Sequence, residues 1–179
     1  MKKTLIFIAL IYGAYQYITW KPATLDIASG MEVGESIQFQ GNTFQSDWSA
    51  NPDIIEAYVR RIDRHYDENH PIITHDFVLT TGDYNDPNIV SLKHRGGGNY
   101  YFSWKTRETP KGSLIVYHLI PASAYVQGQI NNIKTGDTIK LNGKISQDSK
   151  ITSSTGAFLA LRHDNHKFIL VDDVNSVFQ

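Results

Sequence analysis

Residues 130–145 have the sequence INNIKTGDTIKLNGKI, and this stretch decides the predicted fold. Gly136-Asp137 is typical of a tight turn, and Ile139 and Leu141 then alternate with polar residues, as in a strand with one buried face. Gly143 interrupts the strand pattern, where glycine is typical of a bulge or a sharp bend. Small Greek-key barrels of the oligonucleotide- and oligosaccharide-binding (OB) type contain such strands, and so do all-β proteins in general. The stretch therefore predicts a small barrel or a curved sheet.

On both sides of this stretch, the sequence is dominated by short β-rich runs separated by turn residues. The expected strands cover residues 35–41, 73–80, 89–94, 100–105, 114–120, 138–145, 157–161 and 168–171. Glycine, proline, asparagine and aspartate are concentrated between them. We therefore expect an α+β fold, mainly β, whose core is an antiparallel small barrel or curved sheet, with an OB-like barrel as one form of it.

Two helices are expected in addition to the strands. An amphipathic helix is predicted at about 51–67, because Asn51 can cap its N-terminus and Pro52 suits the first helical position. Its apolar residues recur at spacings of three and four, at Ile55, Tyr58, Val59, Ile62 and Tyr66. A shorter helix is expected within residues 123–133, where apolar residues also have near-helical spacing.

The first twenty residues indicate where the protein is located. Lys2 and Lys3 precede the uncharged residues 4–20, which as a helix would extend about 25 Å, the lower limit for crossing a bilayer. The two lysines favour a cytoplasmic N-terminus. We therefore expect a single-pass inner-membrane anchor in residues 1–20, a linker in 21–32, and a single β-rich periplasmic domain in 33–179.

A cleaved signal peptide is the alternative, because a charged start and a short apolar stretch fit that class too. Cleavage requires small residues at two positions, and the three possible sites put Tyr12, Lys21 or Asp26 at one of them. This mismatch favours an uncleaved anchor. The lipid bilayer is then the expected partner of residues 4–20.

The composition excludes several classes of function. The 179 residues include no cysteine, which rules out disulfides, thiolate metal sites and thiol nucleophiles. A formal net charge of −1 argues against a broad basic face, so no duplex nucleic acid is expected as a partner. The sequence contains no Gly-x-Ser-x-Gly, Ser-x-x-Lys or His-Glu-x-x-His motif. We therefore assign no catalytic residue, no cofactor and no metal site.

The seven histidines suggest metal or acid–base chemistry, but their spacing gives little support for it. His163 and His166 have a ligand-like spacing, yet the Asp-Asn between them is typical of a turn. His75 and Asp76 are neighbours on an expected strand and therefore point to opposite faces. His118 lies within an apolar strand, where a hydrogen-bonded core histidine is the commoner role, and we keep it as a candidate binding residue.

Trp104 and Arg95 are the other candidate binding residues. Trp104 belongs to the aromatic run 100–104, and an exposed face of that strand near Lys105 would suit ligand stacking or a partner. Arg95 precedes glycines 96–98, whose amides suit a phosphate, although a hairpin turn is the simpler explanation of those glycines.

Four segments carry a resemblance to a known family: Asp76-Phe77-Val78-Leu79, the aromatic strand 100–104, His118-Leu119-Ile120-Pro121-Ala122, and residues 133–143. Their order is similar to that in a family of uncharacterised proteobacterial membrane-anchored proteins with a single N-terminal anchor and a β-rich exported domain. The resemblance covers about residues 74–145 and departs from the family pattern in 152–162. It implies topology and fold, and it brings no activity with it.

Together these features predict a non-enzymatic, membrane-tethered periplasmic domain that binds another envelope protein. The first alternative is a ligand-binding module for glycan or single-stranded nucleic acid, with Trp104 exposed on a barrel face. The second alternative is a hydrolase that uses His118 with a turn aspartate.

Overall fold

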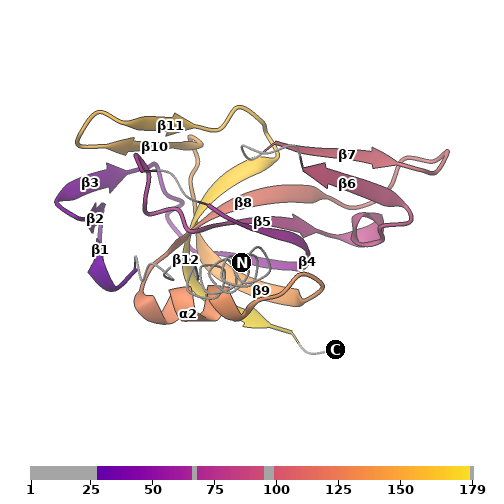
Figure 1. Ribbon diagram of the computed structural model, residues 1–179, viewed down its shortest axis with the longest axis horizontal. Helices are drawn as coiled ribbons and strands as arrows, with labels where there is room; N and C mark the ends of the chain where they lie inside the picture. The colour runs from indigo at the N-terminus through magenta and orange to yellow at the C-terminus, as the bar shows by residue number, and fades with distance from the viewer. Residues whose placement is uncertain (1–27, 66–67, 95–98, 178–179) are drawn as a thin grey trace, which may run out of the picture.

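A closed five-stranded barrel forms the centre of the protein in a computed structural model that describes residues 28–65, 68–94 and 99–177 (Figure 1). The barrel strands are β4 (Asp53–Arg64), β5 (His75–Thr80), β8 (Leu114–Pro121), β9 (Thr138–Ile145) and β12 (His166–Ser176). Their order around the barrel is β12-β8-β5-β4-β9. The predicted mainly β fold with a small barrel is therefore confirmed.

One pair of barrel strands departs from the antiparallel arrangement that the sequence predicts. β8 and β12 run parallel, with Phe168 opposite His118, whereas the other four pairs are antiparallel. Strand directions cannot alternate around a closed ring with an odd number of members, so at least one pair of neighbours must be parallel. The long connection that parallel strands require is supplied by a helix and three strands, β9 to β11, which lie between β8 and β12 in the chain.

The helix α2 (Ala124–Asn132) packs against β8 and β12 and confirms the shorter helix predicted within 123–133. Ser123 caps it, because its hydroxyl oxygen accepts a hydrogen bond from the amide of Val126 at 3.3 Å. Val126, Ile130 and Ile133 join the core cluster that fills the barrel. The helix therefore adds apolar side chains to the barrel interior.

Alternate residues of the strands fill that interior. Phe77 and Leu79 of β5 and Tyr117 and Leu119 of β8 belong to one core cluster, and none of them is more than 5% exposed. The residues between them face the outside of the barrel, and they too are buried because further layers cover that surface. One side of β5 and β8 is thus core, and the other carries the candidate site.

The amphipathic helix predicted at about 51–67 is wrong, because most of this segment is strand β4. Ile55 and Val59 are four residues apart, a spacing that also places two residues on the same face of a strand. Ile62 follows after three residues, and the register shift between Val59 and Arg61 absorbs this odd step, so Ile62 still packs on the barrel core. A bulged strand has therefore produced a helix-like pattern.

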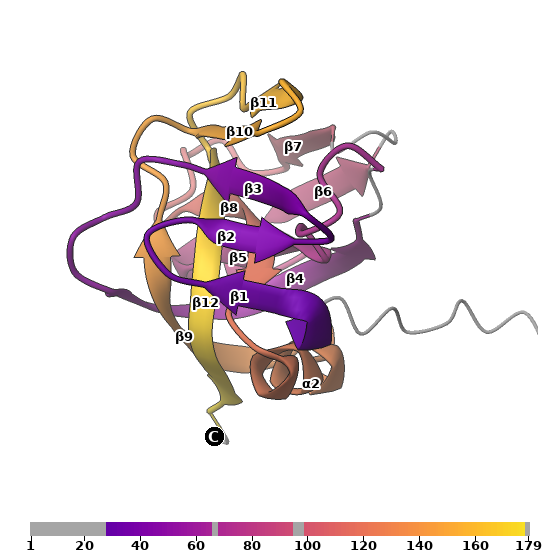
Figure 2. The same ribbon diagram turned by 90° about the vertical axis from the view of Figure 1, so that its left-hand side faces the viewer.

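A second sheet covers part of the outside of the barrel (Figure 2). In spatial order it consists of β1 (Met31–Val33), β2 (Ile37–Phe39), β3 (Asn42–Gln45), β10 (Lys150–Ser153) and β11 (Phe158–Ala160). Ile37, Phe44 and Ile151 from this sheet form a core cluster with Phe168 and Leu170 of β12. Packing of the second sheet therefore buries the outward side of β12.

A two-stranded sheet of β6 (Val90–His94) and β7 (Tyr100–Trp104) follows the 3-10 helix η2 (Gly82–Asn85). Arg60 of β4 fixes its position, because the guanidinium donates to the backbone carbonyls of Tyr84 and Val90. Leu92 packs with Val116 of β8 in a third, smaller cluster. The outer surface of the barrel is thus covered by the second sheet in one part and by this hairpin in another.

The described chain begins inside the predicted linker of 21–32. Ala28, the first residue of the 3-10 helix η1 (Ala28–Gly30), is buried, and its amide donates to Oε1 of Gln127 at 3.0 Å. This segment therefore packs on the domain. The predicted anchor, residues 1–20, lies outside the described residues. In the part of the chain that is described, no helix has the length and apolarity needed to cross a bilayer.

Candidate functional site

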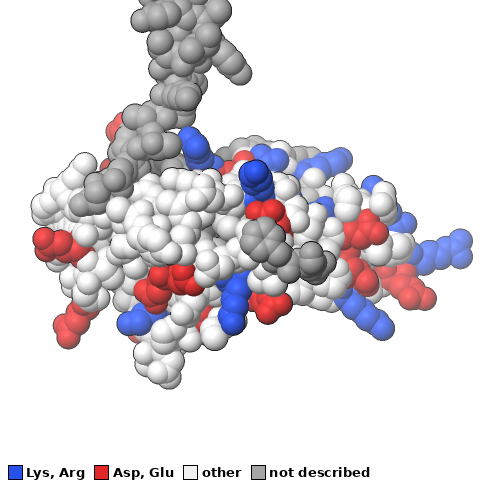
Figure 3. All heavy atoms as spheres, turned by 90° about the horizontal axis from the view of Figure 1, so that it is seen from below, with Lys and Arg blue, Asp and Glu red and all other residues white. Residues whose placement is uncertain are grey.

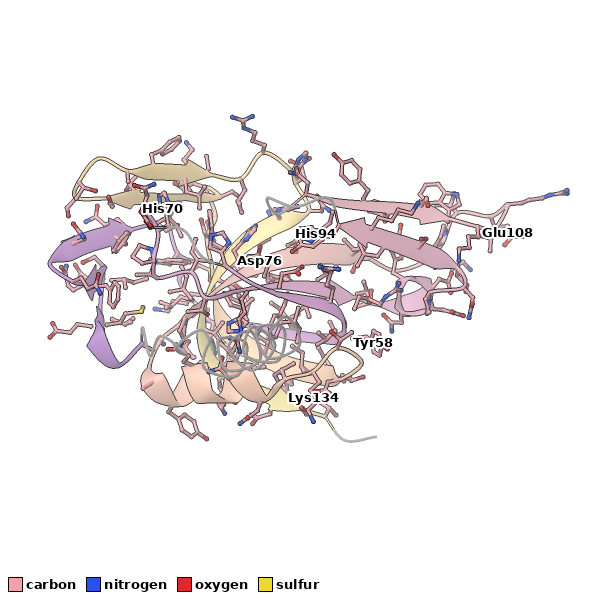
Figure 4. All side chains as sticks on the ribbon, viewed as in Figure 1. Tyr58, His70, Asp76, His94, Glu108 and Lys134 are labelled. Carbon is pink, nitrogen blue, oxygen red and sulfur yellow. The ribbon has the colours of Figure 1, made fainter. Side chains whose placement is uncertain are left out.

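A row of polar residues crosses three barrel strands on the outward face. The register places Asp76 of β5 opposite both Asp63 of β4 and His118 of β8. The neighbouring residues Phe77 and Leu119 point into the barrel, so the polar side chains point away from it. Figure 4 shows Asp76 on the barrel and His94 on the adjacent hairpin. Polar groups therefore gather on the outward face of the barrel, beside the hairpin.

Asp76 is the central acceptor of this cluster. Its Oδ1 lies 2.7 Å from Nδ1 of His118 and 3.4 Å from Nδ1 of His65. The Asp76 and His118 side chains are only 6% and 7% exposed. Burial alone would raise the pKa of Asp76, but the hydrogen bonds and charges of His118 and His65 lower it well below its usual range. Asp76 is therefore a buried carboxylate whose charge is stabilised by imidazoles.

His118 connects Asp76 to a third histidine. Its Nε2 is 3.1 Å from Nδ1 of His166, the first residue of β12, and the ring centroids are 5.3 Å apart. The ring of His163, on the exposed turn before β12, has its centroid 5.5 Å from that of His166. Burial, together with His118 and His163, lowers the pKa of His166 to about 4. The His166 ring is therefore neutral at pH 7 and can accept one hydrogen bond.

Asp63, next to Asp76 in the row, has different partners. Arg61 donates two hydrogen bonds to its carboxylate, at 2.5 and 2.6 Å, and the Tyr100 hydroxyl donates a third at 2.9 Å. The hydrogen bond from Arg61 lowers the pKa of Asp63 against the opposing effect of burial. The His94 ring stacks on the Tyr100 ring, with centroids 4.8 Å apart. Asp63 is thus neutralised by an arginine, whereas Asp76 is surrounded by histidines.

One group in this cluster has the donor atoms of a metal site. One ligand atom from each of His65, Asp76 and His118 lies within 4.8 Å of the other two. Two imidazole nitrogens and a carboxylate oxygen are a common ligand set for divalent transition metals. The sequence prediction of no metal site did not anticipate this group.

The three sequence-predicted binding residues have different outcomes. His118 lies in the cluster, but it contacts the strand residue Asp76 and not a turn aspartate. Trp104 is 45% exposed on β7, away from the cluster. Arg95 lies outside the described residues. Asp76, His65 and His166 were not predicted as site residues, although a single charged residue in the buried strand β5 is a signal that could have identified Asp76.

The hairpin forms a separate surface feature. Tyr101, Phe102 and Trp104 of β7 are 51%, 40% and 45% exposed, and the Phe102 and Tyr84 rings form an edge-to-face pair with centroids 6.0 Å apart. Tyr100, at the other end of the strand, packs against the barrel. The predicted aromatic strand therefore buries one end and exposes three rings.

Comparison with models of known protein families gives no match, and no curated protein matches the chain.

Proposed function

We propose that the chain is a non-enzymatic, membrane-tethered domain of the bacterial envelope that binds another envelope protein. Residues 4–20 would anchor it in the inner membrane, with the N-terminus in the cytoplasm and the barrel in the periplasm. The uncharged stretch that follows the two lysines supports this placement. The proposal assigns the function to the outside of the barrel.

The connectivity of the barrel supports a binding role. In chain order the barrel has three strands that pair antiparallel (β4, β5 and β8), then α2 and two further strands (β9 and β12), with β6–β7 and β10–β11 inserted between barrel strands; the third and fifth barrel strands are parallel. This order matches the topology of an OB-type Greek-key barrel. Barrels of this type bind their ligands on the outer face of the second and third strands. Here that face of β5 and β8 is buried, so the hairpin that covers it is the surface open to a partner. This is an argument from fold, so it supports binding in general and not one ligand.

The features of strand β7 support a protein as the partner. Its five residues, Tyr100–Trp104, include no charge, and among the described strands β7 pairs with β6 alone. An uncharged, aromatic edge strand is a template for another strand, and native proteins usually protect such edges. Addition of a strand from a partner would pair the edge and cover the exposed rings. We therefore propose β7 as the docking strand.

Charge argues against duplex nucleic acid as the partner. On the face seen in Figure 3, acidic and basic side chains are interspersed, and the whole chain has a formal charge of −1. Phosphate backbones are bound by clustered positive charge. A protein strand needs no such cluster, because backbone hydrogen bonds and apolar contact provide the affinity.

Photo-crosslinking in intact cells tests the docking strand. A photoreactive phenylalanine analogue replaces Phe102 in the full chain, with Phe158 of β11, which is 59% exposed, as the matched control position. We expect one discrete protein adduct from position 102 and none from position 158. Trp104→Asp should reduce that adduct at least fivefold without changing thermal stability. Equal adducts from both positions, or none from position 102, would contradict the proposal.

Stacking of a glycan or a single-stranded nucleic acid on Trp104 is the second candidate, favoured by the exposure of that ring beside Lys105. Titration with such ligands should then change tryptophan fluorescence in the wild type and not in Trp104→Phe. The hydrolase alternative gains no support, because both ring nitrogens of His118 already have hydrogen-bond partners.

A further inference from the structure

The donor atoms of His65, Asp76 and His118 converge from three barrel elements. His65 directly follows β4, Asp76 is on β5 and His118 is on β8. Oδ1 of Asp76 lies between Nδ1 of His118 and Nδ1 of His65. We propose that these three side chains bind one divalent transition-metal ion, with two imidazole nitrogens and one carboxylate oxygen as ligands.

The distances are close to those that coordination requires. Ligand atoms at 2.0–2.1 Å from a tetrahedral ion are about 3.3 Å apart. The distance from His65 Nδ1 to Asp76 Oδ1 is 3.4 Å, and that from His118 Nδ1 to Asp76 Oδ1 is 2.7 Å. The first already fits and the second must lengthen by about 0.6 Å. The ligand atoms of His65 and His118, which lie within 4.8 Å of each other, must also come to about 3.3 Å.

The charge balance of the cluster also favours a cation. The recorded ion-pair partners of Asp76 among the described residues are the two histidines, His65 and His118, whereas neighbouring Asp63 has Arg61. A carboxylate that is 6% exposed needs a compensating charge or strong hydrogen bonds. A divalent ion between Asp76 and the imidazoles would supply this charge at the position where the row lacks an arginine.

His166 provides the outer contact that metal-binding histidines usually have. A histidine ligand commonly donates its second N–H to a neighbouring acceptor, which fixes the ring and its tautomer. Nε2 of His118 lies 3.1 Å from Nδ1 of His166. Coordination through Nδ1 requires both His118 and His166 to carry their proton on Nε2, so that Nε2–H of His118 donates to the free Nδ1 of His166. The His118 ring is therefore already oriented for coordination.

The ligand set selects the class of ion. Mg²⁺ and Ca²⁺ prefer sites made entirely of oxygen ligands, whereas imidazole suits Zn²⁺, Co²⁺ and related ions. Three protein ligands leave a fourth position for water or for a group from a bound partner. His65 is 22% exposed, so this side of the site is the route by which an ion enters.

Metal titration of the full chain in detergent tests the proposal. We expect Zn²⁺ and Co²⁺ to bind at one ion per chain in competition with a chromophoric chelator, and Mg²⁺ not to bind. Co²⁺ should give visible absorption bands of a four-coordinate site. Asp76→Asn and His118→Gln should each weaken Zn²⁺ binding by at least about 100-fold. His163→Gln and His94→Gln are matched controls and should change it less than about threefold.

Several results would overturn the proposal. Absence of stoichiometric Zn²⁺ binding by the wild type would be one such result. Another would be a loss of binding in His163→Gln as large as that in His118→Gln, which would move the site to the turn before β12. Circular dichroism shows whether each variant folds. His65→Gln changes the most exposed of the three ligands, so it tests the site even where Asp76→Asn does not fold, and unchanged Zn²⁺ affinity in this variant would contradict the proposal.

Discussion

Gly143→Ala should destabilise the protein because the added methyl group has no room. A Cβ atom at this position would lie 2.3 Å from the carbonyl oxygen of Leu170 and 3.1 Å from Cγ1 of Ile169. Gly143 pairs with Asp53 of β4 and with Val171 of β12, next to the register shift in β12. The glycine thus allows β9 and β12 to approach where the barrel closes.

The size of the effect follows from what must move. The close neighbour is a backbone oxygen, which cannot rotate away, so β9 and β12 must separate locally. Overpacking of this kind costs about 1–3 kcal/mol, and a weakened interstrand hydrogen bond adds about 1 kcal/mol. The lower entropy of the unfolded alanine chain offsets about 0.4–1 kcal/mol. We therefore expect a net loss of about 2 kcal/mol, or about 4–8 °C in Tm.

Urea unfolding of the full chain, followed by circular dichroism, measures this change. Gly128→Ala is the matched control, because Gly128 is an exposed position of α2 and a Cβ there meets nothing within 4 Å. The control should raise the free energy of unfolding by about 0.5–1 kcal/mol through helix propensity. Equal or greater stability of Gly143→Ala, with an unchanged m value, would refute this description of the barrel closure.

Two further substitutions test the core and the N-terminal segment. Burial, and then the charge of Asp53, raises the pKa of Tyr117 to about 12, so its contribution to stability is complete below pH 10 and is lost as pH rises from 10 to about 12. Urea unfolding at several pH values across this range should show that the wild type loses up to about 3 kcal/mol of unfolding free energy and that Tyr117→Phe does not. The same pH dependence in both proteins would contradict this prediction. Gln127→Ala removes the acceptor of the Ala28 amide hydrogen bond and should lower the free energy of unfolding by about 1–2 kcal/mol. Hydrogen exchange at the Ala28 amide should become faster. An unchanged exchange rate there would show that this hydrogen bond does not hold the N-terminal segment on the domain.

The strands with strict alternation and clear turns were predictable from the sequence. Residues 138–145 match β9, and 114–120 match β8 to within one residue, because both patterns are local. Strands β1, β3 and β10 have only three or four residues and were not predicted. Too few residues are present in such strands to establish a period.

The predictions that failed concern features that depend on pairing across the barrel and not on local sequence. A bulge at Arg60 gave β4 the spacing of a helix, and the parallel pairing of β8 with β12 follows from ring closure and not from any local pattern. The site depends on long-range register: Asp76 and His166 are 42 and 48 residues from His118 in sequence. His118 alone was predicted as a candidate, since a polar residue in an apolar strand is visible locally, while its partners are not.

Thiol labelling tests the central claim, that the barrel lies outside the cytoplasm and that a partner covers β7. Because the chain has no cysteine, Ser103→Cys on β7 and Phe158→Cys on β11 each provide a single thiol at an exposed position. A membrane-impermeant maleimide should label position 158 equally fast in spheroplasts and in the purified chain. It should label position 103 several-fold more slowly in spheroplasts. Labelling of either position only after the membrane is permeabilised would contradict the account, as would equal rates for position 103 in both samples.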